Sequence, residues 1–248
     1  MREERYKAIL ELLEKQEFIT VEELCDTLGV SIATVRRDLA TLANRKSLIR
    51  SRGGAMKISS GQTSIPLTYR RVSQISAKMA IAKRAASFVK ENSVIFIDSS
   101  ATANYIINHL KNLNNVIIVT NSLEVAATTK NINAKTYCLC GSINGNSASV
   151  GGYLAVESAG FFNIDTFFFS AYGLDSKGNI VEAFDDEIEL KELLLNNANC
   201  SVFLCDRSKI DKTEAYVLGS LSKVDYMITN EPLSEHFPQP KREVIVVE

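Results

Sequence analysis

The sequence has no hydrophobic run that approaches the roughly 20 residues needed to cross a bilayer. Its charged first residues also show no apolar core of the kind that signal peptides carry. The 5 cysteines form no CxxC pair, which argues against a zinc site or a disulfide framework. His109 and His236 have no obvious ligand companions, so we predict no metal ion and no cofactor. These absences predict a protein of the reducing cytoplasm without a membrane anchor.

An excess of charge of either sign is also missing, because the 248 residues carry a formal net charge of −1. The content of 46% hydrophobic and 23% charged residues is ordinary for a globular protein. The chain is longer than a typical single domain, so we expect two domains.

The most informative segment, residues 31–42, has the pattern of an amphipathic helix. Apolar residues at helical spacing predict a buried stripe: Ile32, Val35, Leu39 and Leu42. Ser31 is a favourable N-cap, and the small residues Ala33 and Thr34 would let the start of the helix approach a groove closely. Arg36 and Arg37 fall at the solvent edge of the stripe. The segment therefore predicts a DNA recognition helix. The residues that it would present to the major groove are Ser31, Ala33, Thr34, Arg36 and Arg37.

The preceding residues predict the rest of a helix-turn-helix. Residues 2–16 have the pattern of an amphipathic helix. Thr20 and Glu23 have the spacing of a capping box, in which each side chain bonds the backbone amide of the other. Gly29 follows a second short helical pattern and accepts the left-handed conformation that ends many helices.

Residues 48–55 predict a short two-stranded wing, with Arg50 and Arg52 on one face of an extended chain. Residues 31–57 carry 7 Lys or Arg against 1 acidic residue, a balance of +6. Residues 1–30 carry 4 against 8, a balance of −4. Neutralising DNA phosphates requires such a local basic cluster. The alternative is an ordinary three-helix bundle whose exposed face is basic.

Composition also divides the chain. We expect a winged helix-turn-helix domain over residues 1–57 and a linker over 58–75, which is rich in Ser and Gly near its start and contains Pro66. Residues 76–248 form the second predicted domain. There, apolar runs typical of buried strands alternate with helical patterns. This alternation predicts a layered α/β domain with a mostly parallel sheet. The predicted strands are residues 93–97, 116–119, 135–139, 166–169, 201–204, 226–229 and 244–247.

Polar clusters follow several of these strands. Ligands of open parallel sheets bind outside the carboxyl ends of the strands. After the first strand, backbone amides and the hydroxyls of Ser99, Ser100 and Thr102 could hold a phosphate. Lys209, after a later strand, would add a cation. These clusters predict a pocket for an anionic ligand.

Two pairs of residues have simpler interpretations. Cys138 and Cys140 lie two apart on a predicted strand, so they share a face, and we expect them to be packed as buried apolar residues. Glu187 and Lys191 have the i,i+4 spacing of an ion pair on a helix surface.

The N-terminal motif resembles that of the DeoR family of bacterial transcriptional regulators. Residues 31–39 resemble the family's S-x-x-T-[IV]-R-R-D-L. Residues 49–55 are similar to its I-x-R-x-x-G-G-A, with one position fewer between the arginine and the glycines. The sequence departs from the family before the wing, where residues 45–47 lack the usual glycine.

The resemblance extends over nearly the whole chain. Residues 98–102 are similar to the family's D-x-G-[ST]-T loop, residues 120–122 to T-N-S, residues 165–175 to D-x-x-F-x-x-x-x-G-x-D and residues 206–209 to D-x-S-K. Ser100 and Ala101 replace a glycine and a hydroxyl residue of the first loop. Gly141-Ser142 stands where the family has two glycines.

The resemblance implies a winged helix joined to a sensor domain related to sugar-phosphate isomerases. It also implies a double-stranded DNA operator, a phosphorylated sugar or similar metabolite as effector, and a homo-oligomer such as a dimer or tetramer, usually acting as a repressor. The residues implied to line the effector pocket are Asp98, Ser100, Thr102, Thr120, Asn121, Gly152, Gly173, Asp175 and Lys209.

Two other functions are compatible with the second domain. A sugar-phosphate isomerase fused to a DNA-binding module would need a carboxylate base, for which Asp98, Asp175 and Glu182 are candidates without an evident acid partner. Alternatively, the altered phosphate loop could belong to a module that only oligomerises. We expect a regulator rather than an enzyme, with no catalytic residues.

Overall fold

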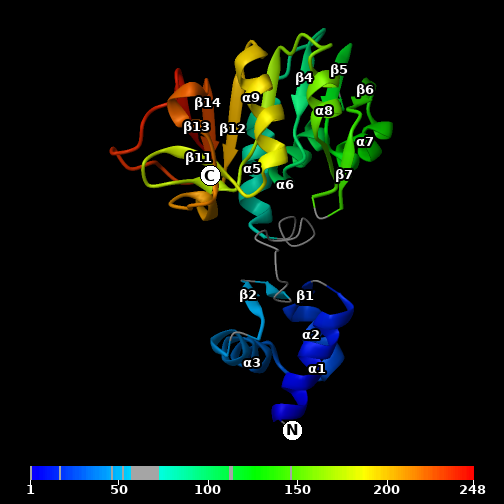
Figure 1. Cartoon of the computed structure of the whole chain (residues 1–248), viewed down its shortest axis with the longest axis vertical. Helices are drawn as coiled ribbons and strands as arrows, with labels where there is room; N and C mark the ends of the chain where they lie inside the picture. The colour runs from blue at the N-terminus through cyan, green and yellow to red at the C-terminus, as the bar shows by residue number, and fades with distance from the viewer. Residues whose placement is uncertain are drawn as a thin grey trace. The chain divides into compact units, whose positions relative to one another are not determined.

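A computed structural model of the chain describes residues 2–16, 18–45, 47–51, 53–56, 73–111, 114–145 and 147–248. The chain divides into two compact units, Met1–Ser73 and Gln74–Glu248 (Figure 1). Arg52 and most of the predicted linker lie outside the described residues. No helix in these ranges is both long enough and apolar enough to cross a membrane.

The N-terminal unit has the predicted winged helix-turn-helix architecture. Its elements are α1 (Arg2–Lys15), β1 (Phe18–Thr20), α2 (Val21–Leu28), α3 (Ile32–Asn44), β2 (Ile49–Ser51) and β3 (Gly54–Met56). The three strands form an antiparallel sheet in the order β1-β3-β2. Side chains from all three helices and the sheet share one core, in which Ile9, Leu24 and Leu39 have no exposed surface.

Local capping explains where the two helices of the motif begin. The Thr20 hydroxyl accepts a hydrogen bond from the Glu23 amide at 3.0 Å, and the Glu23 carboxylate accepts one from the Thr20 amide at 2.8 Å. Gly29 ends α2 in the left-handed region with a φ of 64°. Ser31 then caps α3 by accepting a hydrogen bond from the Thr34 amide at 3.3 Å. The predicted capping box and turn are confirmed.

The C-terminal unit is built on a seven-stranded sheet in the order β15-β14-β12-β9-β4-β5-β6, with every neighbouring pair parallel. The predicted mostly parallel sheet is therefore confirmed. Its strands are β4 (Val94–Ile97), β5 (Val116–Thr120), β6 (Ala134–Cys138), β9 (Thr166–Phe169), β12 (Ser201–Cys205), β14 (Tyr226–Thr229) and β15 (Glu243–Val246).

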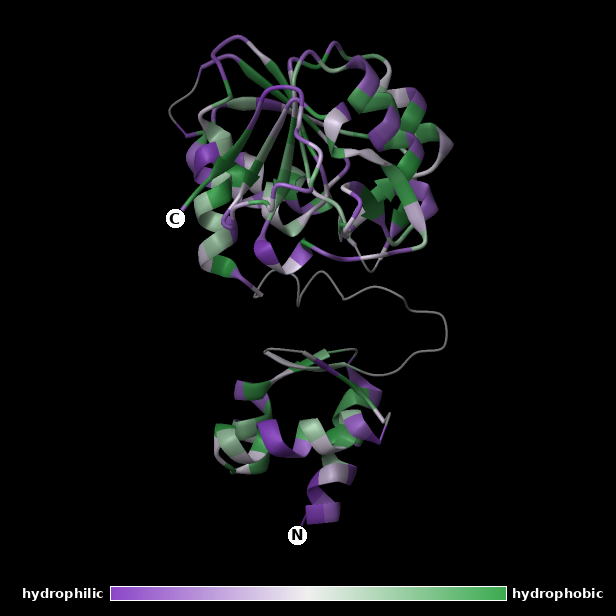
Figure 2. Cartoon of the chain, turned by 90° about the vertical axis from the view of Figure 1, so that its left-hand side faces the viewer, coloured by the Kyte–Doolittle hydropathy of each residue, from purple (hydrophilic) through white to green (hydrophobic). Residues whose placement is uncertain are grey.

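Both faces of this sheet are covered, which explains the continuous apolar runs. One face packs against α5 (Ile75–Ala86), α6 (Ala101–Asn104) and the 3₁₀ helix η1 (Tyr105–His109). The other packs against α8 (Tyr153–Ala159), α9 (Ile188–Asn197) and a small antiparallel sheet of β10 (Gly173–Leu174), β11 (Asn179–Glu182) and β13 (Tyr216–Ser220). Figure 2 shows green, hydrophobic strands between helices of mixed hydropathy.

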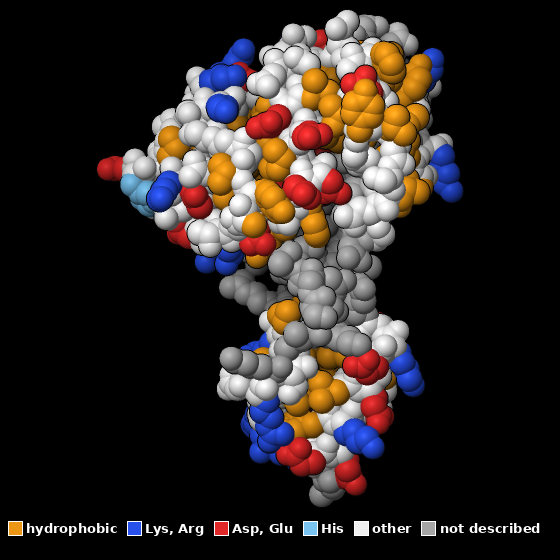
Figure 3. Space-filling model, viewed as in Figure 1, with side chains coloured by type: hydrophobic (Ala, Val, Ile, Leu, Met, Phe, Trp, Pro, Cys, Tyr) orange, Lys and Arg blue, Asp and Glu red, His pale blue; other side chains and the backbone are white. Residues whose placement is uncertain are grey.

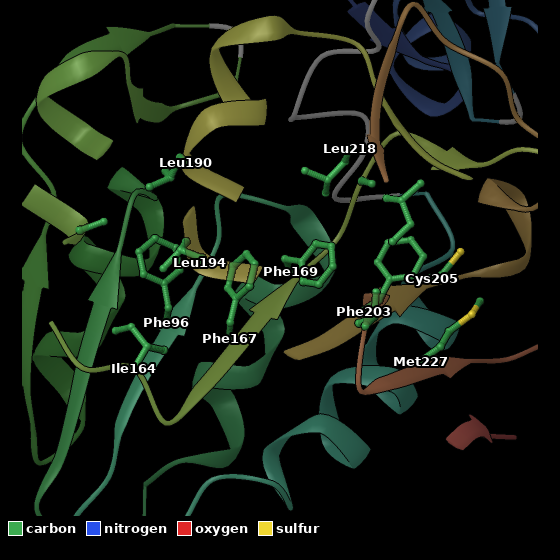
Figure 4. Close-up of a cluster of buried hydrophobic side chains, with 14 of the residues drawn as sticks. Phe96, Ile164, Phe167, Phe169, Leu190, Leu194, Phe203, Cys205, Leu218 and Met227 are labelled. Atoms are coloured by element: carbon green, nitrogen blue, oxygen red, sulfur yellow. The ribbon is translucent and has the colours of Figure 1, made fainter. Parts of the chain in front are cut away.

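Four phenylalanines form a row across the centre of the sheet. Phe167 and Phe169 of β9 stack with their ring centroids 4.7 Å apart. Phe96 contacts Phe167 edge-on at 5.6 Å, and Phe203 lies 5.2 Å from Phe169. Leu190 and Leu194 of α9 lie in the same cluster (Figure 4). This row holds β12, β9 and β4 together, and it therefore fixes the relative positions of their carboxyl ends.

Two expectations about packing are wrong. Cys138 and Cys140 are exposed rather than buried. The reason is that β6 is the last strand on its side of the sheet, a position that periodicity in the sequence does not reveal. Ile32, the first residue of the predicted apolar stripe, is 47% exposed because it lies at the start of α3, before the helix reaches the core.

Other short elements complete the unit. They include α7 (Leu123–Thr128), the 3₁₀ helices η2 (Thr129–Asn131), η3 (Asp185–Glu187), η4 (Arg207–Lys209) and η5 (Leu221–Lys223), and a hairpin of β7 (Ser142–Asn144) with β8 (Ser149–Gly151). The hairpin leads directly into α8.

Candidate functional site

Helix α3 exposes the two arginines that we expected at its solvent edge. Arg36 and Arg37 are exposed, whereas Val35 and Leu39 are fully buried in the core of the N-terminal unit. Neither arginine forms a side-chain hydrogen bond or an ion pair with another described residue, so both guanidinium groups face solvent with their donors available. Two free guanidinium groups on the exposed face of a second helix are suited to the major groove.

The start of α3 is equally accessible. Ser31 and Ala33 are exposed and Thr34 is half-buried. The hydroxyls of Ser31 and Thr34 lie 3.0 Å apart and hydrogen-bond each other. Arg50 of β2 is also exposed, on the wing of the same unit. Arg52 lies outside the described residues, so its predicted role stays a prediction.

Asp38 lies on the buried side of α3, behind the exposed arginines. Its role was not predicted from the sequence. Its side chain is 2% exposed and accepts a hydrogen bond from Nε of Arg5 at 2.8 Å. Nε of Arg2 lies 3.9 Å from the same carboxylate. Asp38 therefore ties α3 to α1. The acidic residue directly after two arginines was the available signal, since a carboxylate is unfavourable on a DNA-facing surface.

In the C-terminal unit, Asp98 joins the ends of two strands. It follows β4, and one carboxylate oxygen accepts a hydrogen bond from the Ser100 amide at 3.0 Å. The other oxygen accepts one from the amide of Ser170, which follows β9, at 2.9 Å. Asp98 is 2% exposed, and burial raises the pKa of its carboxyl. Ser99 and Ser100 are also buried, and the Ser100 hydroxyl caps α6 by accepting from the Ala103 amide at 3.2 Å.

Thr120 and Asn121 occupy the end of the next strand, β5. The Thr120 hydroxyl donates to the Ile97 carbonyl at 2.6 Å and accepts from the Ser122 amide at 2.9 Å. The side-chain nitrogen Nδ2 of Asn121 donates to the Val150 carbonyl at 3.4 Å. These bonds join the ends of β4, β5 and β8, so the predicted polar residues of the first two strands lie side by side.

Three buried polar atoms at these strand ends have no hydrogen-bond partner among the described residues: Thr102 Oγ1, Asn121 Oδ1 and Asp206 Oδ2. They belong to α6 and to the residues that follow β5 and β12, and each residue is less than 5% exposed. A buried polar atom without a partner costs about 1–3 kcal/mol. Such a cost is unusual in folded proteins, and a group of three indicates a place where a polar ligand or water completes the bonding.

Lys209 lies at the same edge, as predicted. Its ammonium donates to the Ser170 hydroxyl at 2.7 Å and to the Ala171 carbonyl at 2.6 Å. Gly173 allows this segment to pack closely, because a Cβ there would meet Lys209 O at 2.7 Å and Lys212 Cβ at 2.5 Å. Gly173 thus positions the backbone that carries the cation.

Asp175 and Gly152 have local structural roles. The Asp175 carboxylate accepts hydrogen bonds from the amides of Lys177 and Asn179 and from the Asn179 side chain, all within the turn between β10 and β11. Although burial opposes it, these bonds lower the pKa of Asp175. Gly152 has a φ of 82° and joins β8 to α8.

Lys191 corrects the expectation of a surface ion pair. Its ammonium is buried and bonds Glu187 Oε2 at 2.8 Å, a Glu182 oxygen, and the Ser170 carbonyl at 3.0 Å. Asp98 Oδ2 lies 3.9 Å away. Burial alone would lower the pKa of Lys191, but the surrounding carboxylates outweigh it and raise the pKa.

Glu182 is the buried partner of Lys191. Its second oxygen accepts a hydrogen bond from the Tyr172 amide at 3.3 Å. Burial raises the pKa of its carboxyl to about 7, in spite of the opposing charge of Lys191. Helical spacing predicted the pair of Glu187 and Lys191. Glu182 reaches Lys191 from β11, and spacing along the helix cannot predict that contact.

Two family models match the chain. Residues 5–61 match the DeoR-like helix-turn-helix domain, and residues 73–231 match the DeoR C terminal sensor domain. The first includes the exposed arginines of α3, and the second includes all the strand-end residues described above.

Curated relatives align over nearly their full lengths. The chain is 29% identical over 230 residues to the glycerol-3-phosphate regulon repressor of Escherichia coli (strain K12), covering 92% of this chain and 91% of that protein. It is 30% identical over 233 residues to the HTH-type transcriptional regulator GolR of Listeria innocua, covering 94% and 92%. It is 28% identical over 245 residues to the HTH-type transcriptional repressor GlcR of Bacillus subtilis, covering 95% and 91%.

Among solved structures, ribose 5-phosphate isomerase A from Neisseria gonorrhoeae matches 56% of this chain and 54% of its own, with a TM-score of 0.41 and 16% identity. The sequence motifs, the winged helix-turn-helix and the two family models agree over both units. The chain belongs to the DeoR family of DNA-binding transcriptional regulators.

Proposed function

We propose that this regulator represses an operon of carbohydrate metabolism and that a phosphorylated sugar binding at the ends of β4, β5, β9 and β12 releases it from DNA. The observation that carries the proposal is the set of three unpartnered buried atoms of Thr102, Asn121 and Asp206. Sugar hydroxyls can donate hydrogen bonds to these atoms. The relatives from E. coli and B. subtilis that are named as repressors support the direction of regulation.

Lys209 supports an anionic group on the ligand. It is only partly buried, and its ammonium lies at the end of β9 beside Ser170. A phosphate placed there would gain a charge-assisted hydrogen bond, which is stronger than a neutral one. Polar acceptors for hydroxyls and a cation for phosphate are thus present at the same edge of the sheet.

We further propose that the site senses the sugar and does not isomerise it. A general base must reach the proton that it removes. The three candidate carboxylates are otherwise engaged: Asp98 by two backbone amides, Asp175 by its own turn, and Glu182 by Lys191 and the Tyr172 amide. These bonds favour a binding role over catalysis. We also propose that the protein acts in the cytoplasm as an oligomer with an even number of subunits, since palindromic operators match two-fold symmetric proteins.

The proposal is tested first on DNA. The full chain is used to select binding sequences from a random duplex pool, and the selected duplex is then titrated by fluorescence anisotropy. We expect tight, salt-dependent binding to a palindromic sequence. Enrichment of no sequence above the starting pool would contradict the proposed regulation.

The effector is tested by thermal shift with a panel of sugar phosphates and the matching unphosphorylated sugars. A ligand that binds only the folded state raises the melting temperature. We expect a phosphorylated sugar to raise it, to lower affinity for the selected duplex, and to be recovered unchanged. Lys209→Ala should abolish the shift. A panel without any shift would favour a C-terminal unit that only oligomerises, and appearance of an isomer would favour an enzyme.

A further inference from the structure

One surface segment of the C-terminal unit is almost free of charge. Between Lys135 and Asp165 the sequence contains a single charged residue, Glu157, although 23% of the whole chain is charged. The segment includes the β7–β8 hairpin and α8. Loss of charge over so long a surface stretch is typical of the centre of a protein interface.

Helix α8 turns large apolar side chains outward. Ala155 and Ala159 face the core and are 0% and 3% exposed. On the opposite side, Leu154 is 60% exposed, and Phe161, two residues beyond the helix end, is 85% exposed. Phe161 lies in the turn that follows the helix, where its amide donates a hydrogen bond to the Ser158 carbonyl at 3.4 Å. The small residues of α8 therefore make its inner contact, and the large ones are left in solvent.

Two neighbours extend this surface. Tyr153, the first residue of α8, is 72% exposed, and Ile143 of β7, which pairs with Val150 shortly before the helix, is 66% exposed. We call Ile143, Tyr153, Leu154 and Phe161 the α8 patch. Hydrophobic side chains gather on the side of the C-terminal unit where α8 lies (Figure 3).

The α8 patch is large enough to form the centre of a protein interface. With about 150–250 Å² for a whole aromatic side chain, its four members expose on the order of 500 Å². A standard interface buries about 800 Å² of each partner, which the patch and its polar rim can supply. An apolar area of this size matches the largest patch of a typical monomer, and such patches are often functional.

We propose that the α8 patch binds a second copy of this chain, so that two C-terminal units associate through α8. A two-fold contact places the same surface on both partners, and any strong charge near the axis would therefore face a like charge. The one charge of the segment, Glu157, is exposed on α8 three residues after Leu154, so the two-fold axis must pass to one side of it. An acidic or basic partner would need complementary charges that the rest of the segment lacks. Tyr and Phe are also the residue types enriched at interface centres.

This inference locates the even-numbered oligomer that the proposed function includes, but its test does not depend on DNA. The full chain is measured by size-exclusion chromatography with light scattering at micromolar concentration, and its dissociation is measured by analytical ultracentrifugation. We expect an assembly of at least twice the 27.4 kDa chain mass. Phe161→Glu and Leu154→Glu should each weaken self-association at least tenfold.

Val217→Glu is the matched control, because Val217 is 54% exposed on β13, outside the α8 patch. It should leave the assembly unchanged, and all three variants should unfold within a few degrees of the unmodified chain. A monomeric unmodified chain would overturn the proposal, and so would an assembly that survives both α8 substitutions. The two proposals can fail separately. If the unmodified chain binds no DNA but forms an assembly that Phe161→Glu dissociates, the interface is upheld and only the proposed function is contradicted.

Discussion

Asp38 and Arg5 lock the recognition helix to the first helix through a hydrogen bond of 2.8 Å, with the carboxylate buried and the arginine three-quarters covered. The hydrogen bond to Asp38 raises the pKa of the Arg5 guanidinium. Asp38 directly follows the two arginines of α3 that face solvent. The motif of two arginines and an aspartate thus combines an outward-facing pair with an inward-facing anchor.

The first prediction concerns this anchor. Asp38→Ala should lower the melting temperature of the N-terminal unit and weaken DNA binding, although Asp38 faces away from DNA. Arg5→Ala should do the same, and the double variant should be little worse than either single one, because both remove the same bond. Calorimetry and anisotropy measure the two effects. Strictly additive losses would contradict the lock.

The second prediction concerns the exposed arginines. Arg36→Ala and Arg37→Ala should each weaken binding to the selected duplex by about tenfold to a hundredfold, since a bidentate contact to guanine contributes about 1–3 kcal/mol. Stability should not change, because neither side chain bonds another described residue. Lys7→Ala, at an exposed position on α1, is the control and should bind normally. Normal binding by both arginine variants would refute the assigned role.

The third prediction separates two buried threonines. Thr102→Val removes a hydroxyl without a partner, so it should leave the unliganded protein equally stable or stabilise it by up to about 1–3 kcal/mol. It should also reduce the thermal shift with the sugar phosphate. Thr120→Val removes a hydroxyl with two hydrogen bonds and should destabilise the protein. Urea unfolding compares them; equal destabilisation by both would argue against a ligand at Thr102.

The fourth prediction concerns pH. Burial raises the pKa of Glu182 from 4.5 to about 7. Between these values the folded protein binds more protons at this site than the unfolded chain does, so the contribution of Glu182 to stability falls as the pH rises through this window. Urea unfolding of the full chain at pH 5 and pH 8 should show this decrease. Glu182→Gln should flatten it, whereas Glu189→Gln, at an exposed position on α9, should not.

The fifth prediction concerns the thiols. Cys138 and Cys140 are exposed, whereas Cys205 is fully buried and burial raises the pKa of its thiol to about 12. A thiol reagent at pH 8 should therefore modify Cys138 and Cys140 first and Cys205 only on unfolding. Mass spectrometry of the modified peptides identifies the order. Early modification of Cys205 would show that the sheet opens around β12 in the native protein.

Local patterns in the sequence were sufficient for the helix starts and the exposed arginines of the N-terminal unit. The bond between Thr20 and Glu23, the left-handed Gly29 and the solvent-facing Arg36 depend on residues within a few positions of each other. Their geometry follows from helix periodicity and capping, which short segments encode. The same applies to the strands of the C-terminal unit, whose apolar runs are continuous because both faces are covered.

Long-range packing decided the rest. Periodicity could not show that β6 ends the sheet and exposes Cys138, because strand order depends on how distant segments pair. It could not show that Lys191 is buried, because Glu182 reaches it from another strand. Nor could it show that Asp38 meets Arg5, 33 positions away.

The sequence by itself determined which residues form helices and strands, where the recognition helix begins, and which family the motifs resemble. Only the tertiary structure decided which polar atoms at the strand ends lack partners and which apolar side chains of α8 remain in solvent. The physical reason is that hydrogen-bond satisfaction and burial depend on every neighbour in space. A sequence pattern specifies the neighbours along the chain alone.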